Sequence, residues 1–117
     1  DRTRFAGLRF RGSLVDDSSP EALAPSLAHA RRALADGIPV PMFTSGDSGI
    51  GLATVMPRHV VLLVADTGDG FLVYEPSVGA ILPLADTELR AGAGRLAALG
   101  HWTRASWLVL PVPARRG

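Results

Sequence analysis

The feature that most constrains the fold is a hydrophobic hairpin in the centre of the chain. Residues His59 to Ala65 (HVVLLVA) form a run rich in β-branched and apolar side chains, and Phe71 to Glu75 (FLVYE) form a second such run. The turn sequence Asp66 to Gly70 (DTGDG) separates them. Two short apolar runs around a glycine-containing turn predict paired antiparallel strands. A third run, Ala80 to Leu84 (AILPL), extends the pair to a meander.

One principal helix is predicted before this hairpin. Ser19 suits the N-cap, and Pro20 suits the first helical position. Pro25 lacks an N–H group, so we expect it to kink the helix or to move its true start toward Ser26. Gly37 favours a left-handed stop. Between these signals, apolar residues recur at helical spacing: Leu23, Leu27, Ala30 and Leu34.

The remaining segments complete an α+β pattern. Apolar and polar side chains alternate over the first half of residues 8–15, which predicts a strand with one solvent-exposed face. Residues 106–112 are mostly apolar and predict a buried strand. Residues 38–43 (IPVPMF) carry two prolines, so we expect an edge strand that pairs on one side only. One or two short helices are expected within 85–99, with Asp86 or Thr87 as cap. The fold class that follows is α+β, with a mainly antiparallel sheet and one principal helix packed on it.

Length and composition predict a single domain covering residues 1–117. A chain of 117 residues with 47% hydrophobic and 20% charged side chains can bury one core. Because the sequence begins with Asp1 instead of methionine, we expect it to be a processed product or a piece of a longer protein.

Several partner and cofactor classes receive no support. The net charge is +1 and the arginines gather at the two ends, so no nucleic-acid partner is expected. The apolar stretch Val60 to Ala65 is much shorter than the roughly 20 residues that a membrane-spanning helix needs. With no cysteine, there is neither a disulfide nor a thiolate metal site. His29, His59 and His101 are too scattered to predict a metal, and no cofactor is expected.

A glycine-rich loop, Thr44 to Gly51 (TSGDSGIG), precedes the hairpin. It has too many glycines for regular structure and is a candidate lid, with Gly46, Asp47, Ser48 and Gly49 as candidate binding residues. These four residues also resemble the nucleophile segment of chymotrypsin-like serine proteases, with Ser48 as nucleophile and His59 as base. Those enzymes place His and Asp far upstream of Ser in a double barrel about twice this length. A flexible loop is therefore the interpretation that we keep.

The order of four motifs resembles the second half of bacteriocin-processing, papain-like cysteine peptidases, the double-glycine leader type. They are Leu34 to Val40 (LADGIPV), His59 to Val64 (HVVLLV), Val73 to Gly79 (VYEPSVG), and a closing segment with Leu99 to Trp102 (LGHW) and Trp107 to Pro111 (WLVLP). The resemblance covers about residues 20–112. In that family a Gly-x-Pro-Val turn leads into a strand, the catalytic His opens the next strand, and an Asp-Pro ends the following one.

The resemblance implies that His59 is the catalytic-type imidazole and that Glu75 orients it. Glu75 stands where the family has Asp, which lengthens the acidic arm by one methylene. The nucleophilic Cys is missing, and without a thiolate no acyl-enzyme can form. We therefore expect His59 and Glu75 to lie side by side without catalysing hydrolysis in this chain alone. His29 and the tryptophans Trp102 and Trp107 are expected to be surface and structural residues, respectively.

Three functional hypotheses remain open from the sequence. The first is a papain-like-fold domain without its nucleophile that binds a peptide or a protein partner, for example along a sheet edge near His59. The second is the C-terminal half of a working cysteine peptidase whose Cys-bearing segment lies upstream or on another chain. The third is a purely structural domain.

Overall fold

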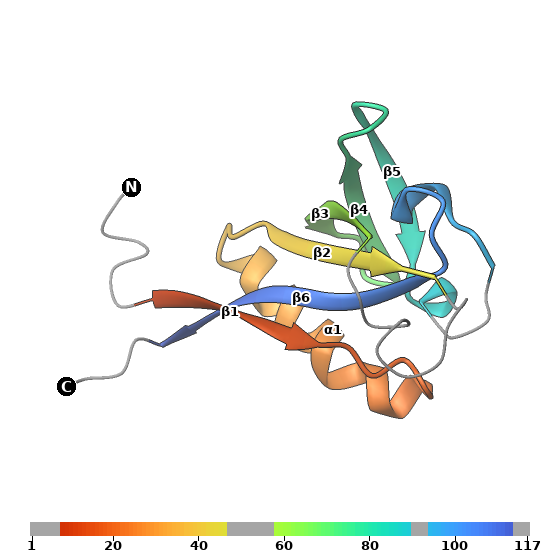
Figure 1. The fold of residues 1–117 in the computed structure, drawn as a ribbon. Helices are drawn as coiled ribbons and strands as arrows, with labels where there is room; N and C mark the ends of the chain where they lie inside the picture. Colours follow the sequence, from red (N-terminus) through yellow and green to blue (C-terminus); the bar gives the residue numbers. More distant parts are fainter. Residues whose placement is uncertain (1–7, 47–57, 90–93, 114–117) are drawn as a thin grey trace.

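The computed structural model describes residues 8–46, 58–89 and 94–113, which form one six-stranded antiparallel sheet with a helix against it (Figure 1). The sheet order is β1-β6-β2-β3-β4-β5. The α+β class with an antiparallel sheet is therefore confirmed. The elements are β1 (Leu8–Leu14), α1 (Pro20–Ala35), β2 (Val40–Ser45), β3 (His59–Asp66), β4 (Gly70–Glu75), β5 (Ala80–Ala85), the 3₁₀ helices η3 (Asp86–Glu88) and η4 (Ala97–Leu99), and β6 (Arg104–Pro113).

The ends of α1 follow the capping signals of the sequence. The hydroxyl of Ser19 accepts a hydrogen bond from the amide of Ala22 at 3.0 Å. At the other end Gly37 adopts a left-handed φ of 76°, and the amide of Ile38 donates to the carbonyl of Ala33 at 2.9 Å, which makes a Schellman stop. The expected start near Ser26 is wrong, because α1 already begins at Pro20.

Helix propensity disfavours Pro25 inside α1, but capping and burial of the first turn stabilise the helix there. The Ser19 cap satisfies a first-turn amide, and Leu23 is buried against the core only if the first turn is helical. Together these terms outweigh the single intrahelical hydrogen bond that a proline removes.

The strands β3, β4 and β5 form the predicted meander. The β3–β4 register places Leu63 opposite Val73 and Asp66 opposite Phe71, with a bulge between Leu63 and Ala65. The β4–β5 register is regular from Gly70 to Glu75. The hairpin around the Asp66 to Gly70 turn is thus confirmed, and it fixes which residues of the two strands share a face.

The position of β2 differs from the sequence expectation. It pairs with β3 on one side and with β6 on the other, so it is a central strand and not an edge. The prolines permit this because the β2–β6 register begins at Met42, after both Pro39 and Pro41. The strand also continues through Thr44 and Ser45, which the sequence analysis assigned to the glycine loop. Both residues are fully buried.

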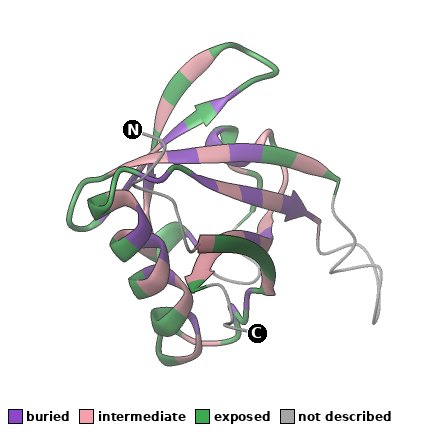
Figure 2. Cartoon of the chain, turned by 90° about the vertical axis from the view of Figure 1, so that its left-hand side faces the viewer, coloured by how far each residue is buried: buried purple, intermediate pink, exposed green. Residues whose placement is uncertain are grey.

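The core lies between α1 and the inner face of the sheet. Figure 2 shows buried residues on the side of α1 that faces the strands and exposed residues on its other side. Leu23, Leu27, Ala30 and Ala33 are the buried helix residues, and they meet apolar side chains of β2, β3 and β6. The inner face of the sheet is therefore covered, and it carries the candidate site at one end.

The segment between β5 and β6 contains the expected short helices, both of the 3₁₀ type. Only the two 3₁₀ helices η3 and η4 occur in its described residues, and Ala85 precedes η3 as N-cap instead of Asp86 or Thr87. Leu96 and Trp102 form an isolated bridge around η4. This bridge folds η4 back against β3, β4 and β5.

Candidate functional site

The imidazole of His59 and the carboxylate of Glu75 contact each other directly. Nε2 of His59 is hydrogen-bonded to Oε1 of Glu75. The register explains the meeting: Leu63 and Val73 are opposite and both buried on the inner face, so residues spaced by two along each strand return to that face. The predicted juxtaposition of the two side chains is confirmed. Their chemical role remains a prediction.

Glu75 is an almost completely buried acid with three hydrogen bonds. It retains 1% of its exposure and accepts bonds from His59, from the hydroxyl of Ser77 and, at 3.2 Å, from the amide of Ser77. Burial raises the pKa of Glu75, but the bonds from Ser77 and His59 together outweigh burial and hold this pKa below its ordinary value. Glu75 is therefore a carboxylate, and Nε2 of His59 must be the donor.

His59 is oriented by its acid while one ring edge stays available. Its side chain is 23% exposed. Within the residues that the structure describes, Nδ1 has no hydrogen-bond partner. A carboxylate on Nε2 fixes the neutral ring as the Nε2–H tautomer, which leaves Nδ1 with a free lone pair. Nδ1 can therefore accept a proton or a hydrogen bond from a ligand.

Gly100 closes one side of the imidazole. It follows η4 with a left-handed φ of 66°. A Cβ at this position would lie 2.3 Å from Cδ2 and 2.6 Å from Nε2 of His59, so only glycine lets the chain approach the ring this closely. Sequence analysis missed this role, although the LGHW motif contains the residue.

Thr44 supports the same corner from the neighbouring strand. It lies opposite His59 in the β2–β3 register and is fully buried. Its hydroxyl donates to the carbonyl of Leu99 at 3.1 Å, which ties β2 to η4 just before Gly100. Because this hydroxyl is buried and already donating, it is a structural group and not an available nucleophile.

The candidate binding loop is mostly beyond the described residues. Gly46 is described and half-buried, directly after β2, whereas Asp47, Ser48 and Gly49 lie outside the described residues. The structure therefore brings together His59 and Glu75 from the predicted site. It adds Ser77, Gly100 and Thr44 as supporting residues.

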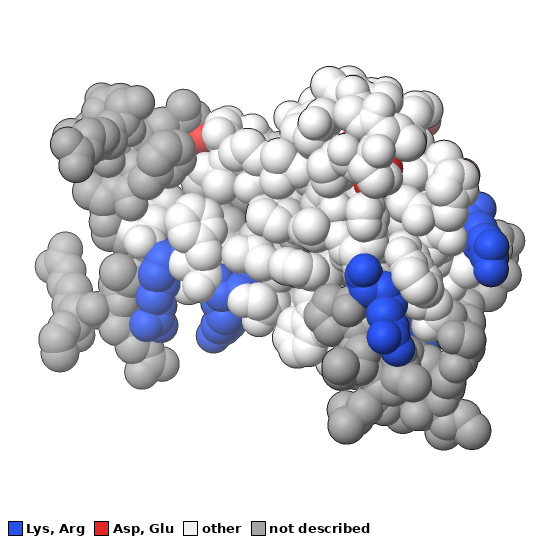
Figure 3. Space-filling model, turned by 45° about the horizontal axis from the view of Figure 1, so that its top comes forward, with Lys and Arg blue, Asp and Glu red and all other residues white. Residues whose placement is uncertain are grey.

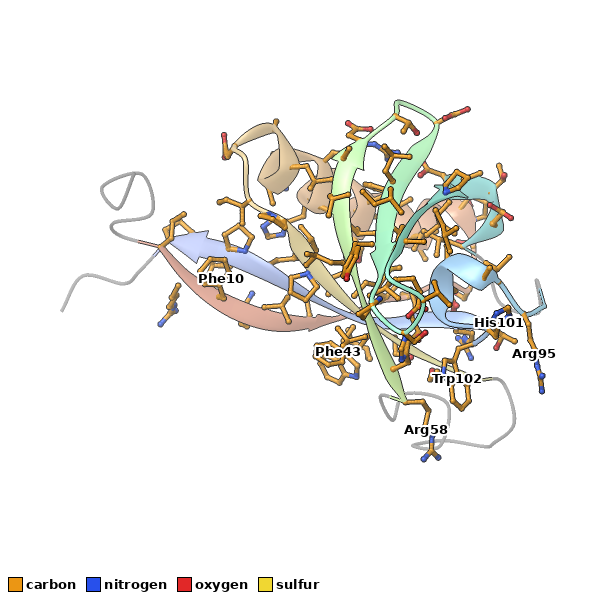
Figure 4. The ribbon with its side chains drawn as sticks, turned by 90° about the horizontal axis from the view of Figure 1, so that it is seen from above. Phe10, Phe43, Arg58, Arg95, His101 and Trp102 are labelled. Carbon is orange, nitrogen blue, oxygen red and sulfur yellow. The ribbon has the colours of Figure 1, made fainter. Side chains whose placement is uncertain are left out.

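The other histidines and the tryptophans make no hydrogen bond to His59 or Glu75 among the described residues, and Trp102 packs against the hydrophobic core. Nε2 of His29 lies 3.1 Å from the carbonyl oxygen of Pro111 and donates to it, so the expectation of a merely solvated surface histidine is wrong. This bond joins α1 to β6. His101 is exposed beside η4, and Figure 4 shows it on the same side of the molecule as Arg95. Trp107 lies between Leu14 of β1 and Phe43 of β2 in the sheet register.

The described ranges contain neither a cluster of metal ligands nor a helix that could span a membrane. No group of three or more His, Asp or Glu side chains in residues 8–46, 58–89 and 94–113 is arranged to hold a metal ion. No described helix has the length and apolar character needed to cross a membrane.

An apolar groove lies elsewhere, between α1 and the segment that follows β5. Its volume is about 840 Å³, and its lining includes Leu23, Leu27, Leu89 and Leu96. Arg31 stands at its side, bonded to Asp86 at 2.8 Å and to Asp66 at 2.9 Å. Neither His59 nor Glu75 belongs to the described lining, so the groove and the His59–Glu75 pair are separate features.

Comparisons with known proteins add no relative. No protein-family model matches the chain, and no curated protein or solved structure matches it either. The geometry around His59 is therefore the basis for assigning a function.

Proposed function

We propose that this chain is a peptidase-related domain of papain-like fold that has no nucleophile and binds a peptide or protein segment beside His59. The observation that carries the proposal is the His59–Glu75 hydrogen bond, completed by Ser77, in a chain with no cysteine. An acid buried beside a partly exposed imidazole is a costly arrangement that packing alone does not require.

The end of β3 next to His59 offers a short stretch of backbone for pairing. The registered β3–β4 pairing begins at Leu62, so within the described residues His59, Val60 and Val61 pair only with β2. The edge strands of the sheet are β1 and β5, so β3 itself is an internal strand. A bound peptide could add hydrogen bonds along these three residues while a donor of the peptide meets Nδ1.

An NMR titration tests the proposal. Peptides that end in two glycines, the class that the resemblance implies, are added while the ring signals of His59 and the amides of residues 59–61 are followed. We expect both sets to shift and to saturate. His29 serves as an internal control, because its ring is bonded to the carbonyl of Pro111 in β6 and should not respond.

A matched variant distinguishes binding at the His59 site from nonspecific binding. Glu75→Gln keeps the size of the side chain but removes the charge that fixes the imidazole, so peptide affinity should fall while the fold is kept. Unchanged His59 signals at high peptide concentration, or equal shifts at His29 and His59, would contradict the proposal.

A second candidate function is favoured by the unpaired Nδ1. In a complete peptidase this nitrogen would take the proton of a thiol, so the chain could serve as the histidine-bearing half of a hydrolase whose cysteine is on another segment. A cysteine at the start of a helix, encoded upstream of this sequence, would support this function. Without such a cysteine, the binding function is the one to keep.

A further inference from the structure

The outer face of the sheet is the set of strand residues turned away from α1. It carries no charged side chain wherever the strands pair without a register shift. Antiparallel sheets with one solvated face normally alternate apolar residues inside with polar residues outside. Here the register aligns Leu14, Trp107, Phe43 and Val60 in one row across β1, β6, β2 and β3. The outward-facing residues of β6 from Trp107 to the end of the strand are all uncharged, and so are the outward-facing residues of β2 up to Phe43.

The same character continues to the other edge of the sheet. Leu62, Tyr74 and Ile81 are aligned across β3, β4 and β5. Ile81 is 58% exposed at this edge, and Phe10 is 53% exposed on β1 at the opposite edge. Figure 3 shows a broad uncharged surface bordered by separate arginine side chains, and Phe43 in Figure 4 projects from the side of the sheet away from α1.

We propose that the outer face is a dimer interface, on which a second copy of this chain packs sheet against sheet. A neutral face meets its own copy without like-charge repulsion, and a net charge of +1 leaves little long-range repulsion between copies. Twisted sheets of this kind pack face to face with their strands about 30° apart.

The size of the face agrees with this occupant. Strands about 4.8 Å apart and six residues long give a six-stranded face of roughly 500 Å² per copy. Two such faces bury about 1,000 Å² in total, which reaches the lower limit for a specific interface. A small charged ligand would find no partner on this face, whereas a second apolar sheet would.

The test measures self-association of the chain by sedimentation over a wide concentration range. The variants Ile81→Glu and Phe10→Glu place one charge at each edge of the face, on exposed strand positions that the core does not need. Each should weaken the dimer at least about tenfold. Val78→Glu is the control, because Val78 is 62% exposed in the β4–β5 turn, outside the face, and should leave association unchanged.

Three outcomes would overturn the proposal. The chain could remain monomeric at every concentration, which would leave the face to a different macromolecule. A dimer could persist unchanged in both variants. A dimer weakened by Phe10→Glu alone would indicate pairing along the β1 edge instead of the face. None of these outcomes bears on the His59 site, because the imidazole faces the opposite side of the sheet.

Discussion

The two ends of β3 each carry an acid paired with a base, and they differ in how much water reaches the acid. At the start of the strand, His59 contacts Glu75, which is 1% exposed. At its end, Asp66 contacts Arg31 at 2.9 Å and its side chain is 36% exposed. Both acids have a pKa below the ordinary value, but for different physical reasons.

The causes of the two pKa shifts explain the difference. The backbone amide of Gly68 is the largest cause at Asp66, followed by the hydrogen bond from Arg31. At Glu75, burial is the largest influence and acts upward, so its hydrogen bonds must overcome it. The Asp66 pair is therefore an ordinary structural tie between α1 and a turn, whereas the Glu75 pair depends on every one of its donors.

Removing the buried acid should have the largest effect. Glu75→Ala leaves the Ser77 hydroxyl and the His59 ring without their acceptor, and we expect a loss of about 2–3 kcal/mol of unfolding free energy. Asp66→Ala should cost clearly less, because water replaces the exposed carboxylate. Urea unfolding of both variants measures the difference. Equal losses would mean that the two ends of β3 do not differ as described.

Adding a methyl group at Gly100 should disturb the imidazole specifically. Gly100→Ala forces a left-handed alanine and pushes a Cβ into His59, so we expect a loss of about 1–2 kcal/mol and displaced His59 ring signals. Gly79→Ala is the matched control: its φ is 64°, and no atom lies within 4 Å of the added Cβ. If the two alanine variants behave alike, the contact between Gly100 and the ring has no energetic weight.

The pH dependence of stability should report Glu75 with a definite sign. Its pKa in the folded state is below the ordinary 4.5, so between the two values the unfolded chain binds more protons. This contribution is fully present above about pH 4.5 and is lost as the pH falls through the folded-state pKa. Glu75→Gln should lack this part of the acid dependence. Parallel acid unfolding profiles for the variant and the parent chain would contradict the assignment.

Added salt should have the smallest effect on stability. It should also distinguish the Asp66 pair from the Glu75 pair. Raising the ionic strength shortens the Debye length to about 3 Å at 1 M and screens exposed pairs much more than buried ones. The stability difference between the parent chain and Asp66→Asn should therefore shrink in salt, whereas that for Glu75→Gln should persist. Thermal unfolding at low and high salt provides the comparison, and equal screening of both would count against the burial argument.

Local patterns were sufficient to predict most of the elements. The meeting of His59 and Glu75 was expected from the resemblance to the peptidase family, and the hairpin that carries both residues follows from apolar runs around a turn. The stop of α1 at Gly37 is equally local. These features depend on neighbours in sequence, which is the information that periodicity carries.

The misses depend on contacts between distant segments. The central place of β2 requires β6, more than sixty residues further along the chain, to pair beside it. The roles of Gly100 and Arg31 likewise exist only once η4 and α1 are packed on the sheet. Ser77 is the exception, because a hydroxyl two residues after an acid is a local signal that could have been recognised.

The most direct measurement is the tautomer of His59, read from the long-range nitrogen and carbon-bound proton couplings of its ring. With Glu75 holding Nε2, neutral His59 should be the Nε2–H form, with Nδ1 unprotonated and able to shift when peptide is added. An Nδ1–H tautomer could not donate to Glu75 from Nε2 and would contradict the account.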